Sequence, residues 1–378
     1  MSKATNRRSS NGAKGAVILL MVAVIVFFIA FYFFNPNDYT GQAEFTATGV
    51  NVSFARNAGS FYVTSNGFFM FNEDNVSFHS NTGEVLFNRE VAMNNPSFSG
   101  TGTYAVVLEQ GGRAAHVFNE QGEIYLATVN EPILNYSLSA SGHLILITGN
   151  SNQCALSLFG TRGELILTDN LAHPNRIPIA SDISSNGQRM AVVFLDFSGA
   201  EFNFIVFFYS IEGNTATIIG SNSYNYSQIL GAVRFVNNHL ITISDFEIRS
   251  YNESGTMVSS IPVDSYITHF SFTNNYFAIA FSESNPNTPG EHPGTVIFFD
   301  TNLNRLSVFE SSNKITGLVT GHNVALITAG RELTAVAANG NTLWRRIITH
   351  DITHAAFLSS PHEIILVGND LAQVFTIN

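Results

Sequence analysis

Residues 338–344 read Ala-Asn-Gly-Asn-Thr-Leu-Trp, a polar turn centred on Gly340 that leads into an apolar run. Gly and Asn accept the positive φ angles of tight hairpins, so this stretch predicts a turn followed by a β-strand. Related turns recur along the chain, and the six steps from Gly83 to Gly340 give a period of about 43 residues. The earlier turns are Asn81–Glu84, Glu120–Glu123, Thr161–Glu164, Glu212–Asn214, Glu253–Thr256 and, without a glycine, Asn302–Asn304.

Two short apolar runs precede the turn position in each repeat, and each kind occurs eight times. A repeat of about 40 to 45 residues with four short strands is typical of a β-propeller blade. The runs of the first kind are Phe68–Phe71, Tyr104–Leu108, Leu144–Ile147, Met190–Leu195, Leu240–Ile243, Tyr276–Phe281, Val324–Ile327 and Ile364–Val367.

The last repeat, Ile352–Asn378, has room for only three strands. The segment Glu44–Phe54, EFTATGVNVSF, has strand character and precedes the first full repeat. Pairing it into the last blade would close the ring and remove exposed strand edges. We therefore predict an all-β, eight-bladed propeller over residues 44–378. Seven blades is the alternative, because the weak first or sixth repeat could be divided differently.

The N-terminal region predicts a membrane anchor. Residues 1–14 carry four basic residues and no acid, and residues 15–34, GAVILLMVAVIVFFIAFYFF, contain no charge. Twenty helical residues span roughly 30 Å, the thickness of the hydrocarbon core of a bilayer. Residues 35–43 then form a linker that begins with Asn35-Pro36-Asn37-Asp38. A cleaved signal peptide is the alternative, but its apolar core is usually about 7 to 15 residues long and ends at small residues.

Charge sets the expected orientation. The basic leader should stay in the cytoplasm under the positive-inside rule, which places the propeller outside. We expect a single-pass protein of the cell membrane, held by residues 15–34, with an extracytoplasmic propeller. Beyond residue 14 the chain has 28 acids and 13 bases, a net charge of −15. Such a domain repels phosphate, so no nucleic acid partner is expected.

The turn-and-strand unit that ends in Leu343-Trp344 resembles the quinoprotein-type and WD-type propeller repeats. The complete layout of basic leader, single helix and Asn- and Phe-rich propeller resembles an uncharacterised family of membrane-anchored propeller proteins in low-GC Gram-positive bacteria. This resemblance covers nearly the whole chain. It implies a fold and a location, and it implies no activity.

Known propeller chemistries find little support in the residues. Trp344 is the only Trp, whereas quinone-dependent dehydrogenases usually carry one in most blades; no cofactor is expected. Sialidase-type Asp boxes are absent, and no second domain could hold a Ser-His-Asp set. The polar cluster His350, Asp351, His354 and His362 reads as a loop and a strand that do not converge like a zinc site, so no metal is expected.

Two functions from different classes follow. The first is a non-enzymatic scaffold that displays loops to a protein or an envelope polymer, since a propeller fixes many loops on one face. The second, the alternative, is small-ligand binding or hydrolysis in the central channel, where polar groups of neighbouring blades can converge. Inward-facing carboxylates, Arg or His would favour the second, whereas Asn, Ser and apolar residues would favour the first. We expect the scaffold and no enzyme.

The connections between second and third strands suggest a partner face. Most are short, but residues 149–153, 196–203 and 282–294 are long, and the last, SESNPNTPGEHPG, contains three Pro and two Gly. These connections open on the same side of a propeller. The expected partner face comprises Asp196, Glu201, Glu283, Glu291 and His292.

Protease accessibility tests the predicted topology. Protease added to cells without their wall should remove the propeller and spare residues 1–14, because the basic leader is expected inside the cell. Immunoblots against tags at the two ends of the chain report the outcome, with lysed cells as the control. Protection of the propeller in intact cells would contradict the predicted orientation.

Overall fold

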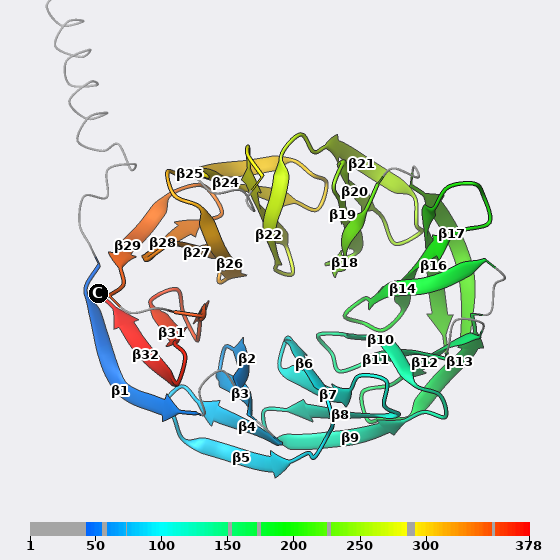
Figure 1. Ribbon diagram of the computed structural model, residues 1–378, viewed down its shortest axis with the longest axis horizontal. Coiled ribbons are helices and arrows are strands. Elements are labelled where there is room, and N and C mark those ends of the chain that lie inside the picture. The colour runs from blue at the N-terminus through cyan, green and yellow to red at the C-terminus, as the bar shows by residue number, and fades with distance from the viewer. Residues whose placement is uncertain are drawn as a thin grey trace, which may run out of the picture. The chain divides into compact units, whose positions relative to one another are not determined.

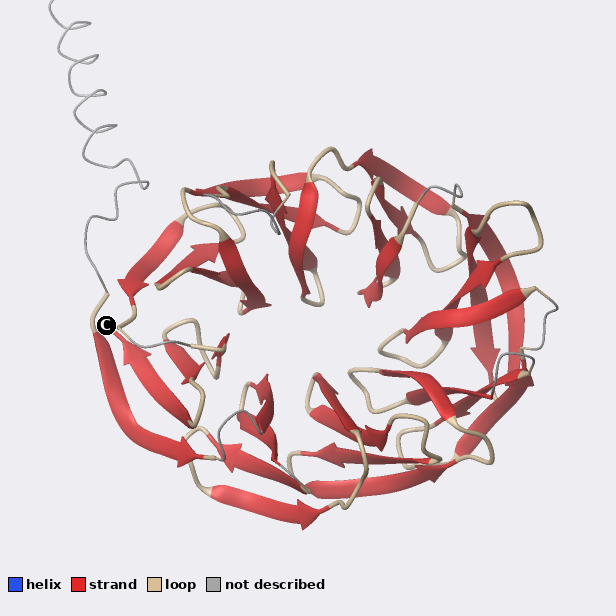
Figure 2. Ribbon diagram, in the orientation of Figure 1, coloured by secondary structure: helices blue, strands red, loops and turns tan. Residues whose placement is uncertain are grey.

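The computed structural model describes residues 43–378 except 55–58, 73, 150–152, 172–174, 225–227, 286–291 and 350–351. These residues form eight antiparallel sheets of four strands each, arranged as a closed ring (Figure 1). Every regular element in the described part of the chain is a strand (Figure 2). The eight-bladed prediction is therefore confirmed, and the seven-bladed alternative is wrong.

In blades 1 to 7 the strands run in chain order from the central channel to the periphery, and in blade 8 the last three strands of the chain do so. The innermost strands of blades 1 to 8 are β2 (Gly59–Thr64), β6 (Pro96–Thr101), β10 (Ile133–Leu138), β14 (Arg176–Ile183), β18 (Leu230–Val236), β22 (Tyr266–Phe272), β26 (Ile315–Gly321) and β30 (His354–Phe357). The second strands are β3 (Gly67–Asn72), β7 (Tyr104–Glu109), β11 (Leu144–Gly149), β15 (Arg189–Asp196), β19 (His239–Ser244), β23 (Tyr276–Ser282), β27 (Val324–Ala329) and β31 (Glu363–Val367).

The outer half of each blade continues the same order. The third strands are β4 (Asn75–Ser80), β8 (Ala114–Asn119), β12 (Cys154–Phe159), β16 (Asn203–Glu212), β20 (Glu247–Tyr251), β24 (Gly294–Asp300), β28 (Glu332–Ala337) and β32 (Leu371–Ile377). The outer strands are β5 (Val85–Glu90), β9 (Gly122–Thr128), β13 (Leu165–Asn170), β17 (Thr215–Ser223), β21 (Met257–Pro262), β25 (Arg305–Ser311), β29 (Thr342–Ile347) and, for blade 8, β1 (Phe45–Ser53).

The second and third strands form the core. Every residue of β11 is buried, and β15 is buried apart from two half-buried positions. Both faces of these strands are covered, because each blade packs between two neighbours. This double burial explains why the sequence shows continuous apolar runs there instead of the alternation of a half-exposed sheet. The outer strands, such as β5, are largely exposed.

Pairing of β1 with β32 closes the ring. The antiparallel register runs from Phe45 opposite Ile377 to Ser53 opposite Leu371, so the segment predicted at residues 44–54 corresponds to β1. Residues before β1 are also fixed, because the Ala43 amide donates to the Arg345 carbonyl of blade 7 at 3.1 Å. The outer edge of β32 is thus occupied by a strand from the other end of the propeller.

The recurring glycine turn has two physical causes. Gly340 has a φ of 91°, a left-handed conformation that favours glycine, and its amide donates to the Ala337 carbonyl at 2.8 Å. A Cβ on Gly163, the equivalent residue of blade 3, would lie 2.6 Å from the Tyr125 side chain of blade 2. The turn must therefore be tight and also small enough to pack against the preceding blade.

Strand order gives the ring two rims. We call the upper rim the side that carries the connections between second and third strands and between consecutive blades. The remaining hairpin turns lie on the lower rim. The predicted leader and membrane segment, residues 1–34, lie outside the described residues. Among the described residues, no helix is long and apolar enough to cross a membrane.

Trp344 tests the packing at the closure, because its side chain is buried there. The side chain is 2% exposed and packs edge-on against Phe45 with ring centroids 5.4 Å apart. Trp344→Ala should lower the free energy of unfolding by about 3 to 5 kcal/mol, since it leaves a large cavity between blades 7 and 8. Denaturant unfolding followed by circular dichroism measures this. Trp344→Phe should lose less, and a loss below about 1 kcal/mol for the alanine variant would contradict the packing.

Candidate functional site

The structure places four of the five predicted partner residues at the upper rim of two different blades. Asp196 is the last residue of β15, and Glu201 lies in the connection between β15 and β16. Glu283 and His292 lie in the connection between β23 and β24. Glu291 lies outside the described residues. Blade 5 stands between the two connections, and the hollow beside Asp196 and Glu201 is separate from the one that His292 lines. Strand order therefore brings these residues to one rim without joining them in one pocket.

Two of these residues hold their own connections in place. Asp196 is 6% exposed, and it accepts hydrogen bonds from Arg176 at 2.7 Å and from the Ser198 amide at 2.8 Å. Burial alone would raise the pKa of Asp196, but the hydrogen bonds from Ser198 and Arg176 outweigh it and hold the pKa below its usual value. His292 is also 6% exposed, and its Nδ1 is 2.7 Å from the Ser284 hydroxyl. Glu201 and Glu283 are exposed.

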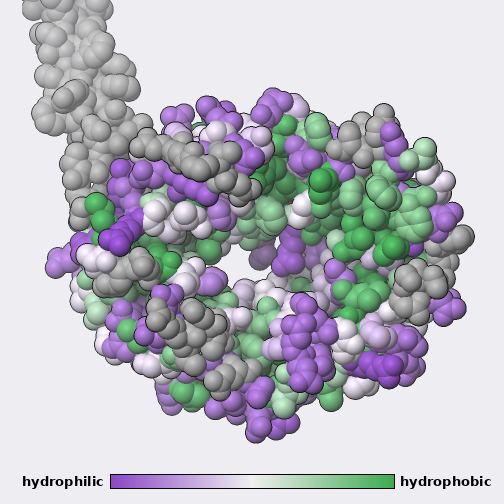
Figure 3. All heavy atoms as spheres, viewed as in Figure 1, coloured by the Kyte–Doolittle hydropathy of each residue, from purple (hydrophilic) through white to green (hydrophobic). Residues whose placement is uncertain are grey.

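Blades 5 and 6 expose apolar side chains on this rim that were not predicted from the sequence. Ile229, Phe246, Tyr266 and Phe270 are 67%, 51%, 51% and 41% exposed. Together they line a groove of about 610 Å³ between the two blades. Figure 3 shows hydrophobic residues gathered beside the central opening in this part of the ring. Exposed apolar patches that are bordered by polar residues are typical of interaction surfaces.

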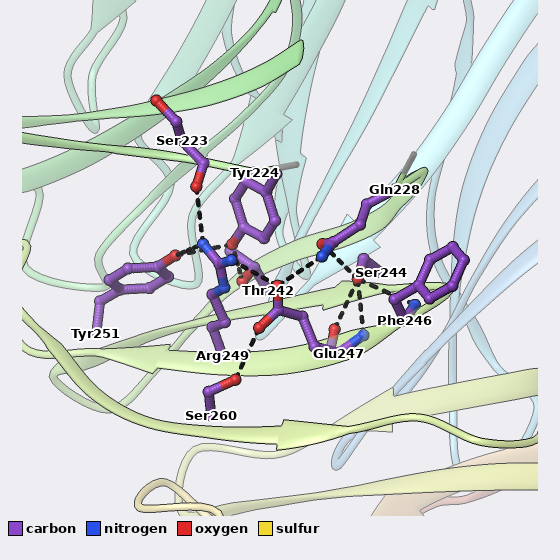
Figure 4. Close-up of polar contacts among 10 residues, drawn as sticks. All are labelled: Ser223, Tyr224, Gln228, Thr242, Ser244, Phe246, Glu247, Arg249, Tyr251 and Ser260. Atoms are coloured by element: carbon purple, nitrogen blue, oxygen red, sulfur yellow. Dashed lines mark hydrogen bonds and ion pairs between the residues drawn. The ribbon is translucent and has the colours of Figure 1, made fainter. Parts of the chain in front are cut away.

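A buried polar network shapes the turn that carries Phe246 (Figure 4). The Ser244 hydroxyl accepts hydrogen bonds from the Phe246 and Glu247 amides, at 3.3 and 2.9 Å. Gln228 is 7% exposed and donates to the Glu247 carboxylate at 2.7 Å. The turn and the segment entering β18 are therefore tied to each other by side chains as well as by packing.

Glu247 is the centre of this network. Its carboxylate accepts hydrogen bonds from Arg249, Gln228 and, at 2.8 Å, Ser260. The hydrogen bond from Arg249 is the main cause that lowers the pKa of Glu247 to about 2. Arg249 in turn lies 4.1 Å from the centre of the Tyr224 ring, and the Tyr224 and Tyr251 hydroxyls are 2.9 Å apart. The charges of Glu247 and Arg249 are thus satisfied by each other and by residues of blade 5 and of the segment that precedes it.

Backbone hydrogen bonds hold Ile229 in a position where its side chain is exposed. Its amide donates to the Asp245 carboxylate at 2.7 Å, and its carbonyl accepts from the Asp245 amide at 3.1 Å. The preceding side chain, Gln228, is buried in the polar network. Ile229 is therefore held with its side chain in solvent on a fixed support. Preorganisation of this kind reduces the entropy lost on binding.

The channel wall beside this groove is mostly apolar. Ile179, Ala180, Val233 and Phe272 line it, and the groove and the channel wall share Gly231 and Phe270. Inward-facing charge comes from Arg234, whose guanidinium reaches Asp182 of blade 4 at 3.4 Å and the Thr101 hydroxyl of blade 2 at 3.1 Å. This contact crosses the channel and links three blades.

Asp182 is fully enclosed by hydrogen-bond donors. Besides Arg234, it accepts from the Ser137 hydroxyl at 2.9 Å and from the Phe235 amide at 2.6 Å. Burial raises the pKa of Asp182, and Arg234 opposes this rise. The pair is thus engaged in joining blades. In the part of the chain that the structure describes, no group of three or more His, Cys, Asp or Glu could hold a metal ion, and His350 and Asp351 fall outside that part.

Substitution of Glu247 tests the network through pH. The folded-state pKa of about 2 lies below the ordinary 4.5, so the carboxylate stabilises the fold above pH 4.5, and this stability is lost as pH falls towards 2. Glu247→Gln should therefore be less stable at pH 7 by about 2 kcal/mol, and the difference should shrink below pH 4.5. Denaturant unfolding at several pH values measures this. Glu253→Gln, at an exposed lower-rim turn, is the control, and a pH-independent difference would contradict the role of Glu247.

Comparison with solved structures shows the fold and nothing finer. The match to BamB from Moraxella catarrhalis covers 88% of this chain and 100% of the BamB chain, at 11% identity and a TM-score of 0.54. Sqt1 of Saccharomyces cerevisiae covers 89% with 98% of its own, at 10% identity and a TM-score of 0.56. The WD40 domain of SCAP from fission yeast covers 88% with 98%, at 11% identity and a TM-score of 0.51.

Sequence comparison gives the family. No curated protein matches the chain. A family of unknown function matches residues 41–377, which include all eight blades. The resemblance to WD-type propellers is consistent with the structural neighbours, whereas the expected bacterial group and membrane anchoring are not addressed by these matches. The chain belongs to the family of unknown function DUF5711.

Proposed function

We propose that this protein is a non-enzymatic interaction module that binds a protein partner through the upper rim of its propeller. The observation that carries the proposal is the groove between blades 5 and 6, where four apolar side chains are exposed on backbone that hydrogen bonds hold in place. Apolar anchors on a rigid support are typical of binding hot spots. The rigid ring keeps these anchors in a constant arrangement.

The proposal includes the location expected from the sequence. Residues 15–34 anchor the chain in the cell membrane as a single span, with the N-terminus in the cytoplasm and the propeller outside. An exposed apolar groove on an anchored domain can meet its partner at the membrane surface or within the envelope. The partner is a protein, since the apolar groove suits protein side chains better than a hydrophilic polymer.

The channel supports ligand chemistry less well. The Arg234 guanidinium is already bound to Asp182 and Thr101, which gives this inward-facing charge a structural role. The channel wall beside the groove is formed mainly by apolar residues such as Ile179 and Val233, and its polar side chains are those of Arg234 and Ser271. We therefore propose no hydrolytic activity for the channel.

Position-specific photocrosslinking in living cells tests the interaction. A photoreactive phenylalanine analogue at Phe246, 51% exposed on the upper rim, should give a reproducible protein crosslink, because the partner covers this side chain. The analogue at Leu165, 54% exposed near the lower-rim turn of blade 3, is the matched control. Mass spectrometry identifies the products. Equal crosslinking from both positions, or none from Phe246 in cells that hold the folded protein, would contradict the proposal.

A further inference from the structure

The groove between blades 5 and 6 combines an apolar floor with an acidic edge. Asp245 and Asp264 line it together with Ile229, Phe246 and Tyr266, and its described lining contains no Lys, Arg or His. We propose that its occupant is a protein segment with large apolar side chains flanked by Lys or Arg. This inference rests on the proposed function and specifies the chemistry of the partner.

The shape of the groove depends on Gly231. Five innermost strands contain a β-bulge near their upper end, at which one residue has no partner in the second strand. The unpaired residues of blades 3 to 7 are Leu134, Ile179, Gly231, Thr268 and Thr316. Blade 5 alone among these five has a residue without a side chain at this position. The missing side chain leaves room where the groove meets the channel wall.

The fold itself does not demand this glycine. Gly231 is not among the glycines with positive φ, and a Cβ there would meet only the Ile243 carbonyl oxygen, at an ordinary 3.6 Å. In blades 6 and 7 the equivalent Thr268 and Thr316 hydroxyls donate to second-strand carbonyls at 3.1 and 3.3 Å. A side chain is therefore compatible with this bulge. The open space at Gly231 suits an occupant better than it serves the packing of the blade.

Charge complementarity points to a cationic occupant. The two Arg residues of blade 5, Arg249 and Arg234, are paired with Glu247 and Asp182, so they do not offset the charges of Asp245 and Asp264. Glu201 and Glu283 add exposed acids to the same rim. Cationic groups beside an apolar anchor would complement this edge and would be steered towards it by the negative field of the domain. A second copy of this acidic face, or an anionic lipid surface, would be repelled.

The size of the groove agrees with a short segment. Its volume of about 610 Å³ lies within the range that binds compact ligands, and its open form admits a chain that enters and leaves. Ile229 and Phe246 stand on hydrogen-bonded backbone at its border, where they can cover the apolar side chains of the occupant. Asp245 holds the Ile229 amide with one carboxylate oxygen, and its negative charge and that of Asp264 can still attract the flanking cations.

Peptide binding tests this chemistry on the full chain in nanodiscs of zwitterionic lipid. The probe is a fluorescein-labelled peptide with Leu and Phe at its centre and Lys at both ends, and binding is followed by anisotropy. Replacement of Lys by Glu, or of Leu and Phe by Ser, should weaken binding at least about tenfold. Empty nanodiscs correct for binding to lipid. Equal binding of the Glu-flanked peptide would overturn the proposal.

Variants of the chain locate the binding. Gly231→Leu places in blade 5 the residue that blade 3 has at its bulge, and it should weaken binding at least about tenfold by filling the groove. Thr316→Leu, which places the same residue at the bulge of blade 7, is the control and should bind normally. Asp245→Asn with Asp264→Asn keeps the acceptor for the Ile229 amide, and it should weaken binding and reduce its salt dependence.

The outcomes separate this inference from the proposed function. Unchanged binding to folded Gly231→Leu would overturn the groove as the site, and the double Asn variant decides the question should the leucine variant fail to fold. Failure of the peptide to bind, with crosslinking from Phe246 intact, would reject the partner chemistry and leave the interaction module in place. Loss of both signals would reject the interaction module as well.

Discussion

The pairing of β1 with β32 is the interaction on which the ring depends, because it joins the beginning and the end of the propeller in one sheet. It also brings Phe45 against Trp344, so that blade 8 is locked to blade 7 by an aromatic contact as well as by backbone hydrogen bonds. Each blade is positioned by its neighbours. An open ring would leave the edge of β32 exposed and would relax the spacing between blades on which the upper rim depends.

In the closed ring the buried strands and the upper-rim connections are under different constraints. The second and third strands are buried on both faces, so their residues are constrained by packing, and the glycine turns are constrained by close approach to the preceding blade. The upper-rim connections carry fewer such constraints. In blade 5 the connection between β19 and β20 is a short turn. Hydrogen bonds among Ser244, Gln228 and Glu247 hold this turn in place. The result is a rigid support for an apolar tip at Phe246.

The sequence was sufficient for the fold because apolar runs such as Leu144–Ile147 and turns such as Asn339–Asn341 follow from local backbone preferences and double burial. The rim was harder to predict. Asp196 and His292 were predicted as partner residues because they border long connections between strands. Both side chains are buried, and their hydrogen bonds hold these connections in place. A Phe in the four-residue turn Ser244–Glu247 was an available signal. The role of Gly231 was not, since a β-bulge depends on register between strands.

The polar network also explains how acids of one blade can differ in role. Glu247 accepts hydrogen bonds from Arg249, Gln228 and Ser260, so its carboxylate stabilises the turn and is neutralised within the blade. Asp245, two residues earlier, supports the backbone of Ile229 and still borders the groove, as Asp264 does. An apolar side chain on a loose loop could fold back to bury itself, whereas the bonds on both sides of Ile229 prevent this. Gln228 links the two roles, because it donates to Glu247 and accepts from Ser244, whose hydroxyl holds the Phe246 amide. The network that satisfies the charge of Glu247 therefore also helps to keep an apolar side chain exposed and fixed, which is the arrangement that recognition of a partner requires.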